Sequence, residues 1–307
     1  METMRWTVAA TFLSAGSLVA VASCISIPDL VSGPDAAAVD ATSETVTDAI
    51  APPDGGADAT NEATAQADAD AGSPCPGTYR DAVLALPGVV AYWRLDETDG
   101  GVARDLHGGN DGIYESGVVL GQPGLLVGDP DPAIALDGGA GSFVQVPYEP
   151  ALALSTFTLA ALVQPASTDA PRQVLARTLT YWLQLDPPQN AGSPPELELG
   201  LIDDAGVDHP EHLPSGDLAA GKVAFVAGTY DGNTVHLYVD GAPIGVVPLH
   251  VGVAQTMHDL FIGSWDGTSN LQSGVVDEAF VASGALTDAQ IAALWAAARG
   301  CAYDAGG

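Results

Sequence analysis

The sequence is poor in basic residues. Its 307 residues include 8 Lys and Arg against 39 Asp and Glu, which gives a formal charge of −31 at pH 7. A charge of this size repels polyanions, so nucleic acid is excluded as an expected partner. Lys222 is the single lysine and no GxxxxGK motif occurs, which excludes a Walker-type phosphate site.

Cysteine and aromatic residues are also scarce. Cysteine occurs at positions 24, 75 and 301, with neither CxxC nor His-x-x-x-His spacing, so a structural zinc site of the usual kind is excluded. Aromatic residues make up 6% of the chain, whereas there are 36 Gly and 22 Pro. This composition predicts turn-rich β structure with some unfolded chain, and it argues against a helical bundle.

The N-terminal segment has the layout of an export signal. Arg5 precedes residues 6–23, which carry no charge. The sequence Val21-Ala22-Ser23-Cys24 resembles the bacterial lipobox, which implies a signal peptide over residues 1–23 and lipid attachment at Cys24. A plain transmembrane helix with an incidental cysteine is the alternative. Because Ile25 rather than Asp follows the cysteine, the resemblance implies an exported protein at the outer membrane or cell surface, anchored to the membrane through its lipid.

Residues 24–74 are predicted to be the lipidated cysteine and a disordered acidic linker. The linker contains ten acidic residues and no Lys or Arg, and most of the others are Ala, Thr, Gly and Pro. Such a segment buries too little apolar surface to offset its conformational entropy. A flexible chain of this length spans roughly 40 Å, so we expect it to act as a spacer.

The folded domain is predicted over residues 75–303, followed by a tail at 304–307. Short apolar runs alternate with turn signals and no amphipathic helix intervenes, which favours an all-β, two-sheet antiparallel sandwich. Asp231-Gly232 and Asp240-Gly241 have the composition of tight hairpins. The predicted strands are 89–95, 133–136, 143–146, 157–163, 181–185, 197–202, 223–230, 235–239, 244–249, 260–262 and 275–281.

One short helix is predicted near the C-terminus. Thr287 and Gln290 form a Thr-x-x-Gln capping box, and Gly300 marks the end. Leu294 and Trp295 are expected to face the sandwich. A sugar platform at Trp295 is the alternative, but its helical spacing is that of a core residue.

Short motifs recur in a fixed order along the predicted domain. They are Tyr92-Trp93-Arg94-Leu95-Asp96-Glu97, Ala103-Arg104-Asp105 with Gly112, Gly121-Gln122-Pro123-Gly124, Ala135-Leu136-Asp137-Gly138, Phe157-Thr158-Leu159, Gly228-Thr229-Tyr230-Asp231-Gly232, Leu237-Tyr238-Val239-Asp240-Gly241 and Gly274-Val275-Val276-Asp277-Glu278. This ordered set resembles the laminin-G-like, concanavalin A-like family, whose fold is an antiparallel jelly-roll sandwich. The resemblance covers nearly all of residues 85–298 and implies a binding module, a glycan-active enzyme or its remnant, or an adhesion module.

The resemblance implies a calcium site. Members of this fold often hold Ca²⁺ through an aspartate after an early strand and an acidic pair in the last strand, and the matching residues here are Asp137, Asp277 and Glu278. Carboxylate oxygens are ligands that Ca²⁺ prefers. The alternative is structural: Asp137 would cap a turn with Gly138, and Asp277 would bind backbone amides of a neighbouring loop.

Catalysis has weaker support in the sequence. Glu196 and Glu198 have the i, i+2 spacing that places two carboxylates on one strand face, as concanavalin-like hydrolases require. The full Glu-x-Asp-x-x-Glu pattern is missing and Pro194-Pro195 precedes the run, so an exposed edge strand is favoured. His209 and His212 are expected in an exposed loop, and a metal site at these residues is the alternative.

We therefore expect a monomeric surface module without enzymatic activity that recognises carbohydrate, with a surface protein as the alternative ligand. Once Cys24 carries lipid, Cys75 and Cys301 remain as a pair. Because the ends of such a sandwich usually lie together and the compartment is oxidising, we expect a disulfide between them. Two free thiols are the alternative.

Overall fold

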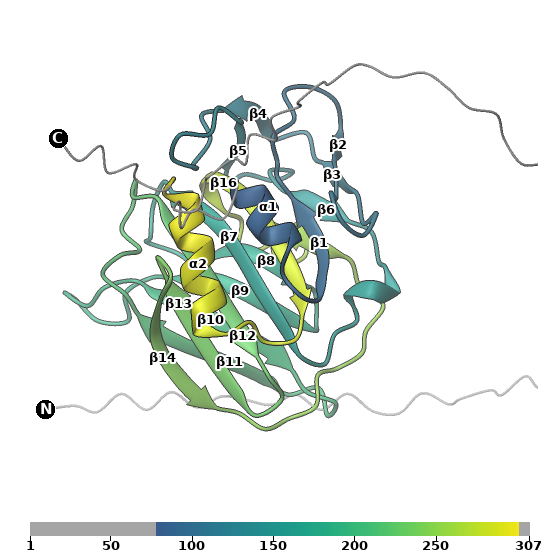
Figure 1. Cartoon of the computed structure of the whole chain (residues 1–307). Coiled ribbons are helices and arrows are strands. Elements are labelled where there is room, and N and C mark those ends of the chain that lie inside the picture. The colour runs from purple at the N-terminus through teal and green to yellow at the C-terminus, as the bar shows by residue number, and fades with distance from the viewer. Residues whose placement is uncertain (1–77, 301–307) are drawn as a thin grey trace, which may run out of the picture. The chain divides into compact units, whose positions relative to one another are not determined.

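The computed structural model describes residues 78–300, which form two facing antiparallel sheets with two helices on one outer face (Figure 1). The prediction of an all-β jelly-roll sandwich with a short C-terminal helix is confirmed. No helix within these residues is long and apolar enough to cross a membrane.

The first sheet has the strand order β14-β13-β12-β7-β16-β5-β4, and β1 pairs with the C-terminal part of β16. All of its strand pairs are antiparallel. Its strands are β1 (Val89–Trp93), β4 (Val119–Gln122), β5 (Ala133–Asp137), β7 (Phe157–Pro165), β12 (Ala224–Tyr230), β13 (Thr234–Val239), β14 (Ala242–Pro248) and β16 (Ser273–Ser283).

The second sheet has the order β11-β10-β9-β8-β15-β6-β3-β2, also antiparallel throughout. Its strands are β2 (Val102–Ala103), β3 (Gly112–Tyr114), β6 (Val144–Val146), β8 (Arg172–Arg177), β9 (Tyr181–Asp186), β10 (Glu196–Ile202), β11 (Asp208–Pro214) and β15 (Leu260–Ile262). A 3₁₀ turn, Pro150–Leu152, follows β6.

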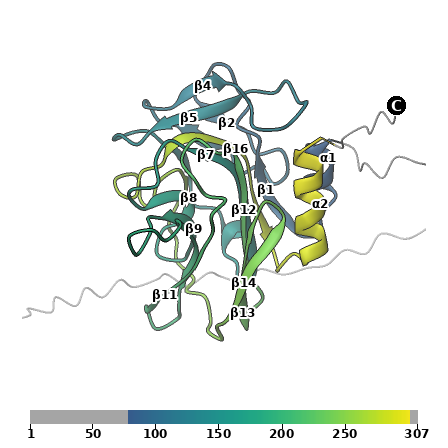
Figure 2. The ribbon, with the colours of Figure 1, turned by 90° about the vertical axis from the view of Figure 1, so that its left-hand side faces the viewer.

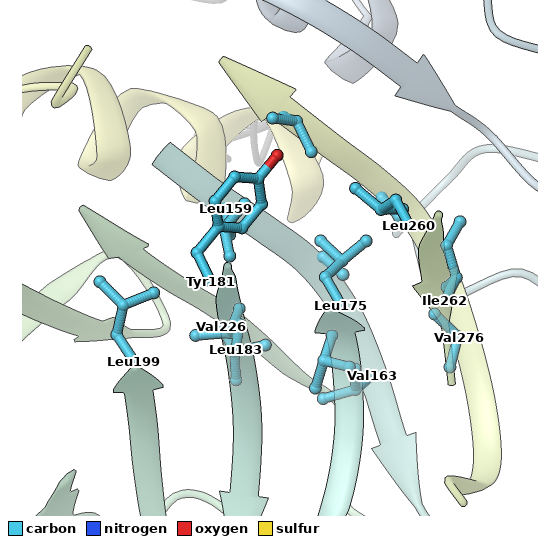
Figure 3. Packing of buried hydrophobic residues seen from close by; sticks show 14 of the residues in the cluster. Leu159, Val163, Leu175, Tyr181, Leu183, Leu199, Val226, Leu260, Ile262 and Val276 are labelled. Carbon is cyan, nitrogen blue, oxygen red and sulfur yellow. The ribbon is translucent and has the colours of Figure 1, made fainter. Parts of the chain in front are cut away.

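The main core fills the space between the sheets. Figure 3 shows Leu159 and Val226 of the first sheet facing Leu183 and Leu199 of the second, with Tyr181 beside them. Side chains alternate along each strand, so every second residue enters this core and its neighbours point away. The outward residues of β9 and β10 are therefore the ones available to build a site.

A second core lies between the first sheet and the two helices. Figure 2 shows α1 (Tyr79–Leu84) and α2 (Asp288–Ala298) on the side of the first sheet that faces away from the second. Phe225 and Phe280 of the sheet pack there against Ile291 and Leu294. The outer face of the second sheet has no such helical cover among the described residues.

The predicted helix features are confirmed in α2. Thr287 accepts from the backbone N–H of Gln290, and the Gln290 side chain accepts from that of Thr287, which completes the capping box. Leu294 is buried, and Trp295, which is half-buried, stacks on Phe225 with ring centroids 6.4 Å apart. A core role for Trp295 is thus confirmed.

Five strands and one helix escape the sequence prediction. Helix α1 has six residues and begins with a capping box formed by Thr78 and Asp81. Strands β2, β3 and β4 have at most four residues each. Strand β8 begins and ends with arginine, and β11 is polar at most positions. Strands β2, β3 and β11 lack an apolar run of three residues, whereas the short runs at β4 and β8, residues 118–120 and 174–176, were not recognised as strands.

Candidate ligand-binding cleft

The candidate site lies on the outer face of the second sheet, where β9 and β10 run side by side. Trp182, Gln184 and Asp186 project outward from β9, between the core residues Tyr181, Leu183 and Leu185. In the strand register these three outward residues lie opposite Gly200, Glu198 and Glu196, respectively. Aromatic, amide and carboxylate groups therefore form neighbouring rows on one face.

The expectation of an exposed edge strand at Glu196 and Glu198 is wrong. Strand β10 lies inside the sheet, between β9 and β11, and the two glutamates are 9% and 7% exposed. The outer strand is β11, where Pro210 and Pro214 occupy edge positions at which a missing N–H is tolerated. Pro194 and Pro195 immediately precede β10, which begins at Glu196, so neither proline lies in the strand.

The expectation of a loop at His209 and His212 is also wrong, although His212 is exposed as expected. Both residues belong to strand β11, and His212 lies directly opposite Glu198. Its Nδ1 is 3.7 Å from Oε2 of Glu198. His209 pairs instead with Asp203, with Nε2 and Oδ2 3.0 Å apart.

A cleft of about 180 Å³ opens over these strands. Trp265 and Asn270, from the connection between β15 and β16, form its other wall. The Trp182 and Trp265 rings meet edge to face, with centroids 5.0 Å apart. The lining residues are Trp182, Gln184, Glu198, Asp208, Trp265 and Asn270.

The loop that carries Trp265 is held by its own hydrogen bonds. Asp266 Oδ1 accepts from the backbone N–H of Thr268 and of Ser269, both at 2.9 Å. The N–H of Trp265 donates to the carbonyl of Ser269. Asn270 is fixed as well, since its amide nitrogen donates to Gln184 Oε1 at 2.8 Å. These bonds position the two loop residues over the strands.

Hydrogen bonds orient the acidic groups of the cleft. Trp182 Nε1 donates to Oε1 of Glu198. Gln184 Nε2 donates to Oδ1 of Asp186 at 2.8 Å. A chain of donors thus runs from Asn270 through Gln184 to Asp186, while Glu198 is held separately by the indole.

Glu198 is a proton-holding group at neutral pH. Burial, followed by the hydrogen bond and the negative charge of Asp186, raises its pKa to about 8, although the Trp182 donor acts in the opposite direction. A carboxyl group in such surroundings can donate a proton or a hydrogen bond where an ordinary glutamate would only accept. The cleft therefore offers donors and acceptors together.

Two of the predicted calcium ligands lie elsewhere, side by side in β16. Asp277 Oδ2 accepts from the backbone N–H of Leu125 at 2.8 Å, the arrangement that the structural alternative describes. Glu278, at a bulge with φ of 54°, accepts from the Tyr92 hydroxyl and from Nε of Arg94 at 3.3 Å. Burial raises the pKa of Asp277 to about 7 and that of Glu278 to about 8.

The third predicted ligand, Asp137, is not brought to this pair. It is exposed at the end of β5, opposite Ser273, four residues before Asp277 in β16. That separation is about 13 Å along a strand. Asp137 Oδ1 accepts from the N–H of Gly139 at 2.7 Å, which is a turn-capping contact. Calcium binding at these residues stays a prediction.

The three cysteines, Cys24, Cys75 and Cys301, lie outside the described residues. The nearest described residues are informative for two of them: Thr78 and Gly300 line one cavity of about 470 Å³, together with α1 and the end of α2. The two ends of the described domain are therefore close together.

Comparisons with known proteins agree with this architecture. Residues 137–292 match the model of the concanavalin A-like lectin/glucanases superfamily. No curated protein sequence matches the chain.

Solved structures with a similar fold include the binding domain of Paraclostridial Mosquitocidal Protein 1, with a TM-score of 0.55 and 13% identity over 68% of this chain. The binding domain of botulinum neurotoxin serotype G has a TM-score of 0.51 and 10% identity over 67% of this chain. The match spans 52% and 50% of those two toxin chains. Domain 4 of the arabinanase AbnA from Geobacillus stearothermophilus, in complex with arabinotriose, has a TM-score of 0.47 and 17% identity, over 67% of this chain and 98% of that one.

Proposed function

Since this chain belongs to the concanavalin A-like lectin/glucanases superfamily, we propose that its described domain is a carbohydrate-binding module whose ligand enters the cleft over β9 and β10. The observation that carries the proposal is the cleft itself, in which an aromatic pair adjoins oriented amide and carboxyl groups. Binding domains of two bacterial toxins have a similar fold. Because one fold serves many functions, the proposal depends on the chemistry of the cleft and not on the fold alone.

The cleft groups match the surface of a sugar. A pyranose has an apolar face of C–H groups that packs on an aromatic ring, and hydroxyls that both donate and accept hydrogen bonds. Trp265 is half-buried, so part of its ring faces solvent, whereas Trp182 is 7% exposed and supports it from below. Asn270, Gln184 and Glu198 supply polar partners beside that ring.

A glycan array probed with the full chain tests this proposal. We expect binding to at least one glycan, and a loss of tenfold or more in affinity for Trp265→Ala. Trp295→Ala is the matched control, because that tryptophan packs α2 onto the first sheet, away from the cleft. Absence of binding to any glycan, or equal loss in both variants, would contradict carbohydrate recognition. Binding that free sugar does not compete would favour a protein ligand.

A glycan-active enzyme is the second candidate, because Glu198 has a pKa of about 8 beside Asp186. A glutamate that holds its proton at neutral pH can serve as the general acid in glycoside hydrolysis. Incubation with each glycan that binds separates the two functions. The binding proposal expects intact glycan, whereas turnover that Glu198→Gln abolishes would favour the enzyme.

We further propose that this module is exported and displayed at the outer membrane or cell surface. The support is the uncharged segment 6–23 and the lipobox-like Val21-Ala22-Ser23-Cys24, followed by an acidic linker. Lipid at Cys24 would hold the protein on the membrane. The linker would carry the cleft away from the bilayer, where an extended glycan can reach it.

A disulfide between Cys75 and Cys301 is proposed as well. Thr78 and Gly300, which follow and precede these cysteines by three residues and one residue, line the same cavity. Short segments from these two positions can bring the thiols together without displacing a described strand. An exported protein would meet the oxidising conditions that the bond requires.

A further inference from the structure

Three side chains with different metal-ligating groups converge on the outer face of the second sheet. Asp186 of β9, Glu198 of β10 and His212 of β11 each offer one ligand atom, and these atoms all lie within 4.8 Å of one another. They come from three adjacent strands, so the backbone ladder fixes their spacing. Within residues 78–300 this is the one group of three such residues that meets that criterion.

Each of the two acids has one oxygen that accepts a hydrogen bond from a neighbouring side chain. Oε1 of Glu198 is occupied by the Trp182 indole, and Oε2 is the atom that faces His212 Nδ1, at 3.7 Å. Oδ1 of Asp186 is occupied by Gln184. Donors that hold one oxygen and turn the other inward are the outer partners that orient ligands in protein metal sites.

Glu196 supplies a separate observation. It lies two residues before Glu198 on the same strand face and directly opposite Asp186. It is 9% exposed, and its Oε2 has no hydrogen-bond partner among residues 78–300. A buried carboxylate oxygen without a donor is costly, unless a cation or another donor satisfies it. The residue with the unsatisfied oxygen is thus a neighbour of Asp186 across the strands and of Glu198 along β10.

We propose that Asp186, Glu198 and His212 form a binding site for a divalent transition-metal ion, with Zn²⁺ as its representative. One imidazole nitrogen and two carboxylate oxygens suit Zn²⁺, whereas Ca²⁺ takes oxygen ligands alone. Tetrahedral ligands at about 2.1 Å from Zn²⁺ lie about 3.4 Å apart, so side-chain shifts of about 1 Å close the site. Glu196 or water completes the coordination.

The ion would neutralise part of a concentrated negative charge. Three carboxyl groups, those of Asp186, Glu196 and Glu198, lie together on two strands of a chain whose formal charge is −31. Because carboxylate ligands must lose their protons to bind a metal ion, protons compete with the ion for these oxygens. The experiment therefore measures binding of the ion itself.

The test is titration of Zn²⁺ into chelator-stripped full chain, followed by calorimetry, with no sugar present. It is therefore independent of the proposed carbohydrate function. We expect one saturable site, and at least a tenfold loss of affinity in His212→Gln and in Glu198→Gln. The His212 side chain is 45% exposed, so its replacement leaves the core intact. Co²⁺ provides a second readout, since its visible absorption should intensify on binding wild type and remain weak with His212→Gln.

The matched control is His209→Gln. His209 lies on the same strand and pairs with one carboxylate, Asp203, rather than two. We expect this variant to bind Zn²⁺ and Co²⁺ as the wild type does. Absence of a saturable site in the wild type would overturn the proposal. Unchanged binding in His212→Gln, or equal loss in His209→Gln, would overturn it too.

Discussion

Gly200 lies directly opposite Trp182 in the pair of strands β9 and β10, and a Cβ atom at Gly200 would come within 2.0 Å of the indole. The glycine therefore leaves the room in which Trp182 lies across the strand. In that position the indole reaches Glu198 with its N–H and Trp265 with its ring. The absence of a side chain at Gly200 therefore allows Trp182 to take the position from which it contacts both Glu198 and Trp265.

We predict that Gly200→Ala destabilises the domain by about 1–3 kcal/mol and weakens carbohydrate binding, because the added methyl forces Trp182 from its place. Urea denaturation and titration of the glycan found on the array measure the two effects. Gly216→Ala is the control, since no atom lies within 4 Å of a Cβ built there. Equal stability of the two variants would show that Trp182 adjusts freely.

The stability of the domain should decrease as the pH rises from about 4 to about 8. Glu198 and Glu278 have pKa values of about 8 in the folded protein, and such groups titrate at about 4 in an unfolded chain. Between those values the folded state binds more protons, so stability is fully present at the acidic end and is lost as the pH rises through 8. Each group contributes a slope of up to about 1.4 kcal/mol per pH unit.

Glu198→Gln isolates one of these groups. The amide does not titrate, so we expect a shallower dependence of the unfolding free energy on pH, measured by urea denaturation at several pH values. Glu149→Gln makes the same substitution at an exposed position, leaves the buried carboxyl groups in place and should keep the wild-type slope. Parallel curves for the two variants would contradict the raised pKa of Glu198.

Replacement of Cys24 should prevent lipid attachment and normal processing. Because its thiol is the acceptor for lipid in the lipobox-like sequence, we expect Cys24→Ala to remain unprocessed or to become soluble. Membrane fractionation and mass spectrometry of the N-terminal peptide measure this. Ser23→Ala keeps a small residue before the cysteine and is the control. A processed Cys24→Ala protein retained on the membrane would contradict lipidation.

Non-reducing peptide mapping should recover a cross-linked peptide containing Cys75 and Cys301. The bond would close a loop of more than two hundred residues, for which chain entropy gives roughly 5 kcal/mol of stabilisation at most. Reduction should therefore lower the melting temperature of protein that has been purified without reductant. Two separately alkylated thiols in that protein would exclude the bond.

Calcium should be tested apart from zinc. If the predicted ligands hold Ca²⁺, excess calcium raises the melting temperature relative to chelator, because an ion that binds the native state alone stabilises it. Asp277→Ala should then abolish the rise, and His212→Gln should keep it. Identical melting curves in calcium and chelator would leave Asp277 and Glu278 with their protein partners, Leu125, Tyr92 and Arg94.

Features that depend on a few neighbouring residues could be predicted from the sequence. Thr287 and Gln290 mark the start of α2 through contacts three residues apart, and these form as expected. Asp240 and Gly241 both have positive φ, 52° and 75°, in the hairpin that joins β13 and β14. Each of these features depends on a few consecutive residues, so the sequence alone contains the information.

The cleft could not be predicted in the same way. The residues Asp186, Glu198 and His212 come together only because three strands lie side by side in a particular register. The polar strand β11, with prolines at two positions, looks like a loop until its place at the sheet edge is known. The spacing of these three residues along the chain predicts neither that their side chains converge nor that Glu198 is buried.

The prolines at the sheet edges bear on how copies of the module meet one another. Pro210 and Pro214 lie in β11, and Pro243 and Pro248 lie in β14, the outer strands at one end of each sheet. Proline gives an incoming strand no N–H to bind, so these edges resist the extension of a sheet from one molecule to the next. A tethered protein crowded at high local concentration would thereby be protected from edge-to-edge aggregation.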